Sequence, residues 1–148
     1  MMRVLSSITG RTKDMYKTST GEYVSSVYIE QALVHNGWFE HALVAAENKP
    51  YVVALLFIEH EWLGRLAIKM HSTPLKVLET DAFKSKVAMF ITKLNKKLNH
   101  WEKVRDYKVI FHTLTIEEGH LTPSMKLAKK FLMESYKETI DEMYKDHV

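Results

Sequence analysis

The sequence predicts an α/β (α+β) fold: a small central sheet of about three strands plus an N-terminal β-hairpin, flanked by about four helices. Two patterns lead to this prediction. Residues 51–58 form a nearly continuous apolar run, which is typical of a strand covered on both faces. Residues 83–98 carry apolar side chains at i, i+4, i+7, i+8, i+11 and i+15, the stripe of an amphipathic helix. A mixed fold follows from finding both in one chain.

Length and composition limit the remaining possibilities. The 148 residues fit one domain, so we expect residues 1–148 to form a single unit. There is no cysteine, which excludes disulfides and cysteine-ligated metal sites. The net charge of +3 is mildly basic, but acidic residues are interleaved with the basic ones, so we expect no nucleic-acid partner. No signal peptide and no apolar run near the ~20 residues of a membrane span are present, so we expect a cytoplasmic or membrane-peripheral protein.

The N-terminal third is predicted to hold a hairpin and a helix. Residues 1–24 are rich in Ser, Thr and Gly with short β-prone pieces, which fits a β-hairpin or a pair of small loops. A helix is expected to start near Ser25 or Ser26, either of which can cap it, and to stop at Gly37. Its apolar face is expected to contain Val27, Ile29 and Leu33, with Ala32 as a further candidate.

The remaining elements follow from periodicity. Two strands are expected at 41–46 and 51–58, joined by a four-residue connection, with the second strand at the centre of the sheet. Helical spacing predicts helices over 62–70, after Thr80-Asp81, and from about 126 to 145. A third strand is expected at 107–112. The lysines beside the apolar stripe of 83–98 could face nucleic acid or anionic lipid, but a solvated helix face explains them.

Several kinds of catalytic site find no support in the sequence. Of the eight histidines, none is paired at i, i+4 with a flanking carboxylate as in zinc peptidases, and His60 has no second ligand nearby in sequence. We therefore expect scattered surface or capping histidines and no metal site. Dinucleotide-binding, phosphate-binding and serine-hydrolase motifs are also missing. Glu117 and Glu118 are adjacent, and such side chains need not face each other.

The stretch from Gly119 to Lys130 is the strongest local candidate for function. It contains a glycine and a proline and leads into an amphipathic helix, so it could present Lys126 to an anionic ligand. The alternative is a plain connection whose lysine is a solvated surface charge. Residue chemistry alone leaves both open.

Two separated segments, taken together, point to a family. The first runs Ile8-Thr-Gly-Arg-Thr-Lys-Asp-Met-Tyr-Lys-Thr-Ser-Thr-Gly-Glu-Tyr-Val-Ser25, and the second is Leu121-Thr-Pro-Ser-Met-Lys126 with its flanks. In order and spacing they resemble the signature motifs of the C-terminal lid domain of AMP-forming acyl-CoA synthetases. The form of both segments most resembles the long-chain fatty acid–CoA ligase branch. The resemblance covers essentially the whole chain.

The resemblance implies a mechanism and a partner. In this family the domain is a lid on a large N-terminal adenylation domain, in the same or a separate chain, which binds ATP and the acyl substrate. One lid orientation forms the acyl-adenylate, and a second allows CoA to attack it. The motif positions imply roles for eight residues: adenylation for Lys126, nucleotide contact for Arg11, the hinge for Lys13 and Asp14, and the thioester-step loop for Lys17, Gly21, Glu22 and Tyr23.

The implied ligands are those of a full-length enzyme: ATP and AMP, CoA, Mg and a fatty acid. We expect none of them to bind tightly to this domain alone, and we expect the 148 residues alone to be inactive. Peripheral membrane association of the full-length enzyme is compatible with the resemblance. One departure is Ala128-Lys129-Lys130, where the family usually has a basic run. The alternative function is a stand-alone, non-enzymatic lid-like module that binds CoA or a partner protein.

Overall fold

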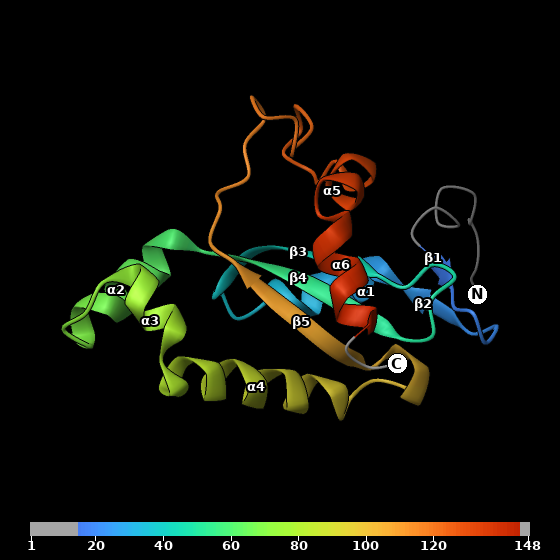
Figure 1. Cartoon of the computed structure of the whole chain (residues 1–148), viewed down its shortest axis with the longest axis horizontal. Coiled ribbons are helices and arrows are strands. Elements are labelled where there is room, and N and C mark those ends of the chain that lie inside the picture. Colours follow the sequence, from blue (N-terminus) through green and yellow to red (C-terminus); the bar gives the residue numbers. More distant parts are fainter. Residues whose placement is uncertain (1–14, 146–148) are drawn as a thin grey trace.

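The computed structural model describes residues 15–145 and contains two sheets (Figure 1). A hairpin pairs β1 (Met15–Lys17) with β2 (Tyr23–Ser25), and a second sheet holds β3 (Phe39–Ala45), β4 (Val52–Ile58) and β5 (Val104–Ile110). The helices in this range are α1 (Ser26–Val34), α2 (His60–Lys69), α3 (Pro74–Glu79), α4 (Asp81–Asn95), α5 (Lys129–Ser135) and α6 (Lys137–Lys145), with a 3-10 turn η2 (His100–Glu102). The predicted α+β class with an N-terminal hairpin is confirmed.

The three-stranded sheet has the order β3–β4–β5, so β4 is central as predicted. β3 and β4 are antiparallel, whereas β5 runs parallel to β4 after the crossover through α2, α3 and α4. Every residue of β4 is buried. A strand buried on both faces cannot alternate polar and apolar residues, which explains the continuous apolar run.

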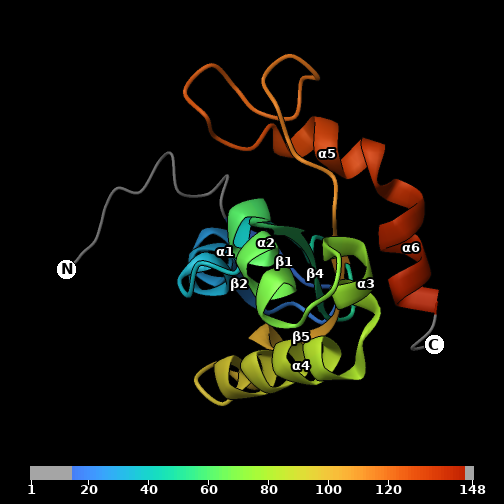
Figure 2. The same ribbon diagram turned by 90° about the vertical axis from the view of Figure 1, so that its left-hand side faces the viewer.

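The sheet has a hydrophobic core on each face, and alternate strand residues divide between them. On one face Ala54 and Leu56 of β4 join a cluster with apolar residues of α1, α2, α3 and α4. On the other, Val53, Leu55 and Phe57 join a cluster with residues of α5, α6 and the segment before them. Figure 2 shows α1 and α6 on opposite sides of the sheet.

Helix termini follow the capping residues in the sequence. The Oγ of Ser25 accepts a hydrogen bond from the backbone N of Tyr28 at 3.3 Å, which confirms the predicted start of α1. Thr80 caps α4 in the same way, with its Oγ1 3.2 Å from the backbone N of Phe83. Gly37 follows α1 with φ of +82°, a conformation that favours glycine.

The C-terminal helix differs from the single segment expected over 126–145. It starts at Lys129 and is divided into α5 and α6 at Tyr136, whose φ and ψ are −107° and 20°. The Tyr136 ring packs edge-on against Phe57, with 5.6 Å between the ring centroids. The change of direction allows Leu132 of α5 and Ile140 of α6 to enter the same core. Amphipathic periodicity alone does not reveal such a break.

Two further features differ from the expectation. α2 agrees with the helix expected over 62–70, but α3 is a further helix that the sequence analysis did not predict. β5 covers 104–110 rather than 107–112: it pairs with β4 from Val104 to Ile110, and the Asn95 side chain bonds both the N and the O of Val104 at its start. Within residues 15–145, no helix is both long and apolar enough to cross a membrane.

Candidate functional site

The loop between β1 and β2 is held in one conformation by its own hydrogen bonds. The buried Thr18 is at its centre: its backbone N donates to the O of Glu22 at 2.9 Å, and its Oγ1 accepts from the N of Glu22 at 3.2 Å. Thr20 Oγ1 donates a short hydrogen bond to the Glu22 carboxylate. Glu22 therefore stabilises this turn from within.

The same loop packs on the turn between β3 and β4. The backbone N of Lys17 donates to Glu47 Oε1 at 3.1 Å, and the N of Asn48 donates to the O of Lys17 at 2.9 Å. Gly21 has φ of +94° and open space around it, so the backbone conformation already explains a glycine here. Tyr23 is 59% exposed, with Lys17 Nζ 5.9 Å from its ring centroid. The hairpin therefore presents a cation and an aromatic ring to solvent.

Lys126 lies on a compact turn. The backbone N of Thr122 donates to the O of Lys126 at 2.8 Å, and Thr122 Oγ1 accepts from the N of Lys126 at 3.2 Å. Leu121 and Leu127 pair across the base as an antiparallel bridge. The Lys126 side chain is exposed, and two residues separate it from the start of α5. We call residues 121–127 the lysine turn. Its hydrogen bonds fix the backbone and leave the ammonium group accessible.

A partly buried ion pair holds the start of α5 against α1 and β3. Lys129 Nζ is 2.8 Å from Glu30 Oε1 and 3.3 Å from Ser26 Oγ. The other carboxylate oxygen of Glu30 accepts from the backbone N of Val44 at 3.0 Å. Lys129 follows the lysine turn, and α1, which contains Glu30, follows directly after β2. The ion pair therefore connects the lysine turn to the hairpin that carries the β1–β2 loop.

Lys126 borders an open groove of about 1130 Å³ between α1, β3 and the beginning of α5. The groove wall combines the Glu30–Lys129 pair with His41 and the exposed Lys130. Burial lowers the pKa of His41 from its ordinary value, and the nearby charge of Glu40 offsets this only in part. The predicted catalytic lysine, Lys126, therefore lies at the edge of a groove that could hold part of a ligand.

The predicted site residues fall into two groups in space. Lys17, Gly21, Glu22 and Tyr23 lie together on the hairpin. Figure 1 shows the segment that precedes α5 (orange) projecting from the sheet on a different side from that hairpin (blue). Arg11, Lys13 and Asp14 lie outside the described residues.

Sequence reasoning missed two features of this region. The inward face of α1 contains Ser26 and Glu30 beside Ile29 and Leu33, and this i, i+3, i+4, i+7 spacing could have shown that Glu30 is buried. The second feature is a cluster of His112, Glu118 and His120. No sequence spacing identified it, because a loop brings these residues together.

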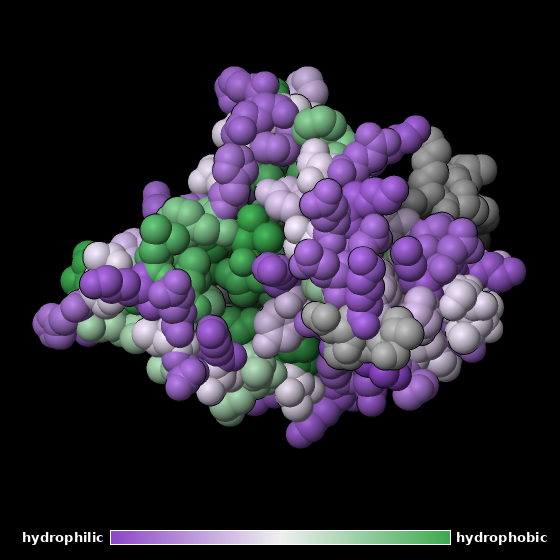
Figure 3. All heavy atoms as spheres, viewed as in Figure 1, coloured by the Kyte–Doolittle hydropathy of each residue, from purple (hydrophilic) through white to green (hydrophobic). Residues whose placement is uncertain are grey.

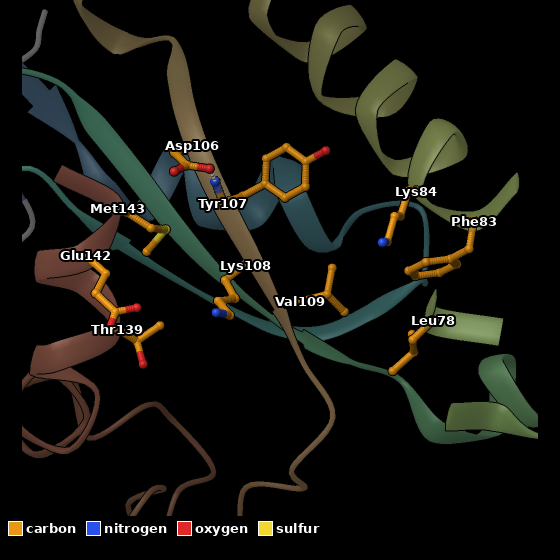
Figure 4. Close-up of a pocket in the computed structure, with 10 residues that line it drawn as sticks. All are labelled: Leu78, Phe83, Lys84, Asp106, Tyr107, Lys108, Val109, Thr139, Glu142 and Met143. Carbon is orange, nitrogen blue, oxygen red and sulfur yellow. Dashed lines mark hydrogen bonds between the residues drawn. The ribbon is translucent and has the colours of Figure 1, made fainter. Parts of the chain in front are cut away.

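Another hollow, of about 410 Å³, lies between β5 and the helices α3, α4 and α6. Figure 4 shows apolar side chains such as Leu78, Phe83 and Val109 along it, with Asp106 and Lys108 on β5. Figure 3 shows hydrophobic atoms gathered on this face between α2–α3 and α6. None of the predicted site residues within the described part of the chain lines this pocket.

Comparison with known proteins agrees with the resemblance seen in the motifs. A family model described as "AMP-binding enzyme C-terminal domain" matches residues 13–148. The long-chain-fatty-acid–CoA ligase FadD15 of Mycobacterium tuberculosis is 27% identical over 143 residues, which are 93% of this chain and 24% of the relative. The chain thus spans about a quarter of the length of that relative.

Solved structures share the fold. The adenylation domain of a carboxylate reductase from Mycobacterium chelonae superimposes with a TM-score of 0.72 at 26% identity, over 90% of this chain and 20% of that one. The A domain of a carboxylic acid reductase from Segniliparus rugosus, in complex with AMP and a co-purified carboxylic acid, gives a TM-score of 0.74 at 23% identity, over 93% and 21%. With the family match over nearly the whole length, these findings establish that the chain belongs to the AMP-binding enzyme C-terminal domain family found in AMP-forming acyl-CoA synthetases.

Proposed function

We propose that this chain acts as the C-terminal lid domain of a long-chain fatty acid–CoA ligase. The overall reaction converts ATP, a fatty acid and CoA into acyl-CoA, AMP and pyrophosphate. The observation that carries the proposal is the family match over residues 13–148, which includes an exposed lysine on a hydrogen-bonded turn. The long-chain fatty acid branch is proposed because the curated relative at 27% identity has that name.

Lys126 is the proposed catalytic residue of the first step. In that step a carboxylate oxygen bonds to the α-phosphorus of ATP, and the bond to pyrophosphate breaks. Negative charge accumulates where the carboxylate meets the phosphate, and a positioned ammonium stabilises it. The lysine turn suits this role, because its backbone is internally bonded while the Lys126 side chain is exposed.

The β1–β2 loop is the proposed element of the thioester step. Lys17 and Tyr23 are exposed on it, while Glu22 and Gly21 set the shape of the turn. Arg11 as a nucleotide contact and Lys13 with Asp14 as the hinge remain predictions from the motif. ATP, Mg and the acyl chain would bind to the large adenylation domain, so we expect the 148 residues alone to form no acyl-adenylate.

A domain exchange tests the proposal. The chain would replace the C-terminal domain of a long-chain fatty acid–CoA ligase, fused in register to that enzyme's large domain. We expect acyl-CoA formation by the fusion and none by either part alone. Lys126→Ala should lower fatty-acid-dependent ATP–pyrophosphate exchange by about 100- to 1,000-fold, and conversion of a preformed acyl-adenylate with CoA should be retained.

Lys96→Ala is the matched control, because Lys96 is an exposed lysine at the end of α4. It should leave both half-reactions unchanged. An inactive fusion that is nevertheless folded, or full pyrophosphate exchange by the Lys126→Ala fusion, would contradict the proposal. Turnover by the 148 residues alone would contradict the need for a partner domain.

A further inference from the structure

The segment between β5 and the lysine turn gathers two histidines and a carboxylate. His112 follows the end of β5, and Glu118 and His120 lie eight residues or fewer further along the chain. His112 Nε2 is 3.2 Å from Glu118 Oε1, and one ligand atom from each of the three residues lies within 4.8 Å of the others. The two imidazole rings are nearly perpendicular, with centroids 5.4 Å apart.

These distances are close to those of a metal site. Four ligands placed 2.0–2.1 Å from a tetrahedral Zn²⁺ ion lie about 3.3 Å from one another. The His112–Glu118 pair already has this separation, and the ligand atom of His120 lies within 4.8 Å of both. Because His112 and Glu118 are about half exposed, an ion from solvent can reach the cluster.

The backbone of the turn holds Glu118 and His120 in place. Thr115 Oγ1 accepts from the backbone N of Glu118 at 3.1 Å and donates to its carboxylate at 3.2 Å. The backbone N of His120 donates to the O of Thr115 at 3.1 Å. Gly119 has φ of +83°, which places the two ligand residues on a tight bend. The turn is therefore formed without an ion.

His120 provides an independent indication of a ligand. Its side chain lies between His112 and Phe131, and the residue is only 8% exposed. Its Nδ1 is buried and has no hydrogen-bond partner among the described residues. Buried polar atoms in folded proteins nearly always have a partner, and those that do not require an explanation. An ion bound through Nδ1 would give this nitrogen a partner.

We propose that His112, Glu118 and His120 form a Zn²⁺ site whose fourth ligand is water. Two imidazole nitrogens and one carboxylate are a known zinc set with an open position, whereas Mg²⁺ and Ca²⁺ prefer oxygen ligands only. The bound ion would connect the end of β5 to the bend before the lysine turn, and so restrict how that turn moves relative to the sheet. The site is independent of the proposed ligase function and can be measured on this chain alone.

Calorimetric titration of the tag-free 148-residue chain with Zn²⁺ tests this site. We expect one ion per chain, a rise in the melting temperature on binding, and no heat with Mg²⁺. His112→Gln and Glu118→Gln should each weaken Zn²⁺ binding at least about tenfold, since even loss of a residue that only supports a ligand costs about that much. Co²⁺ should give the visible absorption of a four-coordinate site, and this should change in both variants.

His100→Gln is the matched control, because His100 is an exposed histidine on η2. It should bind Zn²⁺ as the natural chain does. His120→Gln should also lose binding, but its buried side chain could disturb the turn, so the two exposed residues decide the outcome. The absence of Zn²⁺ binding, or equal affinity in His112→Gln, Glu118→Gln and the natural chain, would show that the cluster is only a surface His–Glu ion pair and would overturn the proposal.

Discussion

Two nearby lysines, Lys126 and Lys129, have different environments and therefore different roles. Lys126 is exposed on a bonded turn, whereas Lys129, three residues later, is directed inward to Glu30. The two lysines have the same charge but different surroundings: one is free to meet a ligand, and the other fixes the helix that follows the turn. A charge that is partly removed from water must be compensated, so Lys129 and Glu30 depend on each other.

The Glu30–Lys129 pair should contribute to stability. Lys129→Met keeps most of the packing but takes the cation away from a carboxylate that is only about one-tenth exposed. We expect a loss of about 1–3 kcal/mol in the free energy of unfolding, less than for a fully buried pair because the Lys129 side chain is 29% exposed. Urea unfolding followed by far-UV circular dichroism would measure it.

Lys130→Met is the control for this pair, since Lys130 is the exposed neighbour of Lys129. It should change stability by less than about 0.5 kcal/mol. The double variant Glu30→Gln/Lys129→Met should recover part of the loss, because the carboxylate charge is also removed. Equal unfolding midpoints for Lys129→Met and Lys130→Met would show that the ion pair adds nothing.

At the scale of elements, helix ends decide where the chain changes direction. Thr80 lies between α3 and α4 and serves both: its Oγ1 donates to the O of Val77 at 2.7 Å and accepts from the N of Phe83 at 3.2 Å. Phe83, Val87 and other apolar residues of α4 then pack into the first core, the cluster that lies on the α1 side of the sheet. A single hydroxyl thus bonds to the last turn of one helix and to the first turn of the next.

Thr80→Ala should destabilise the protein by about 1–2 kcal/mol, because an N-cap side chain and a second hydrogen bond are both lost. Thr92→Ala is a suitable control: Thr92 is exposed within the same helix and its hydroxyl only bonds back to the O of Ala88. That change should be within about 0.5 kcal/mol of neutral. Thermal unfolding would distinguish the Thr80→Ala and Thr92→Ala variants. Thr80→Ser should retain most of the stability that Thr80→Ala loses. Equal losses from Thr80→Ala and Thr92→Ala would disprove a capping role.

At the scale of the whole molecule, β3 and β4 supply side chains to both hydrophobic cores. Two of the three tryptophans, Trp38 and Trp62, stack with 5.5 Å between ring centroids on the face of the first core. α5 and α6 cover the other face, where Leu132 is fully buried. Since the same strands belong to both cores, we expect the two faces to unfold together.

Leu132→Ala tests this coupling. Removal of a fully buried leucine side chain should cost about 2–5 kcal/mol. We expect the fluorescence of Trp38 and Trp62, recorded in a Trp101→Phe background so that it reports on the first core, and far-UV circular dichroism to shift to lower urea by the same amount. Leu75→Ala, at a leucine that is 60% exposed, is the control and should shift neither. A shift in circular dichroism alone would mean that the two faces unfold separately.

The sequence by itself indicated the strands of the main sheet, the start of the first helix and the family. Strong local signals were sufficient for these: the apolar run of 51–58, a capping serine at 25 or 26, and two motifs a hundred residues apart. Such signals depend on neighbours within a few residues, or on residue order, and both are visible without coordinates. The predicted site residues Lys17, Gly21, Glu22, Tyr23 and Lys126 were identified in the same way, and their roles stay predictions.

Only the tertiary structure decided how distant side chains meet. At the bend between α5 and α6, Tyr136 packs against Phe57, which lies on a strand far away in sequence. Glu30 meets Lys129 across 99 positions, and His112 meets His120 through the turn at Gly119. The energies of these contacts arise from burial and from approach in three dimensions, so no pattern along the chain encodes them directly.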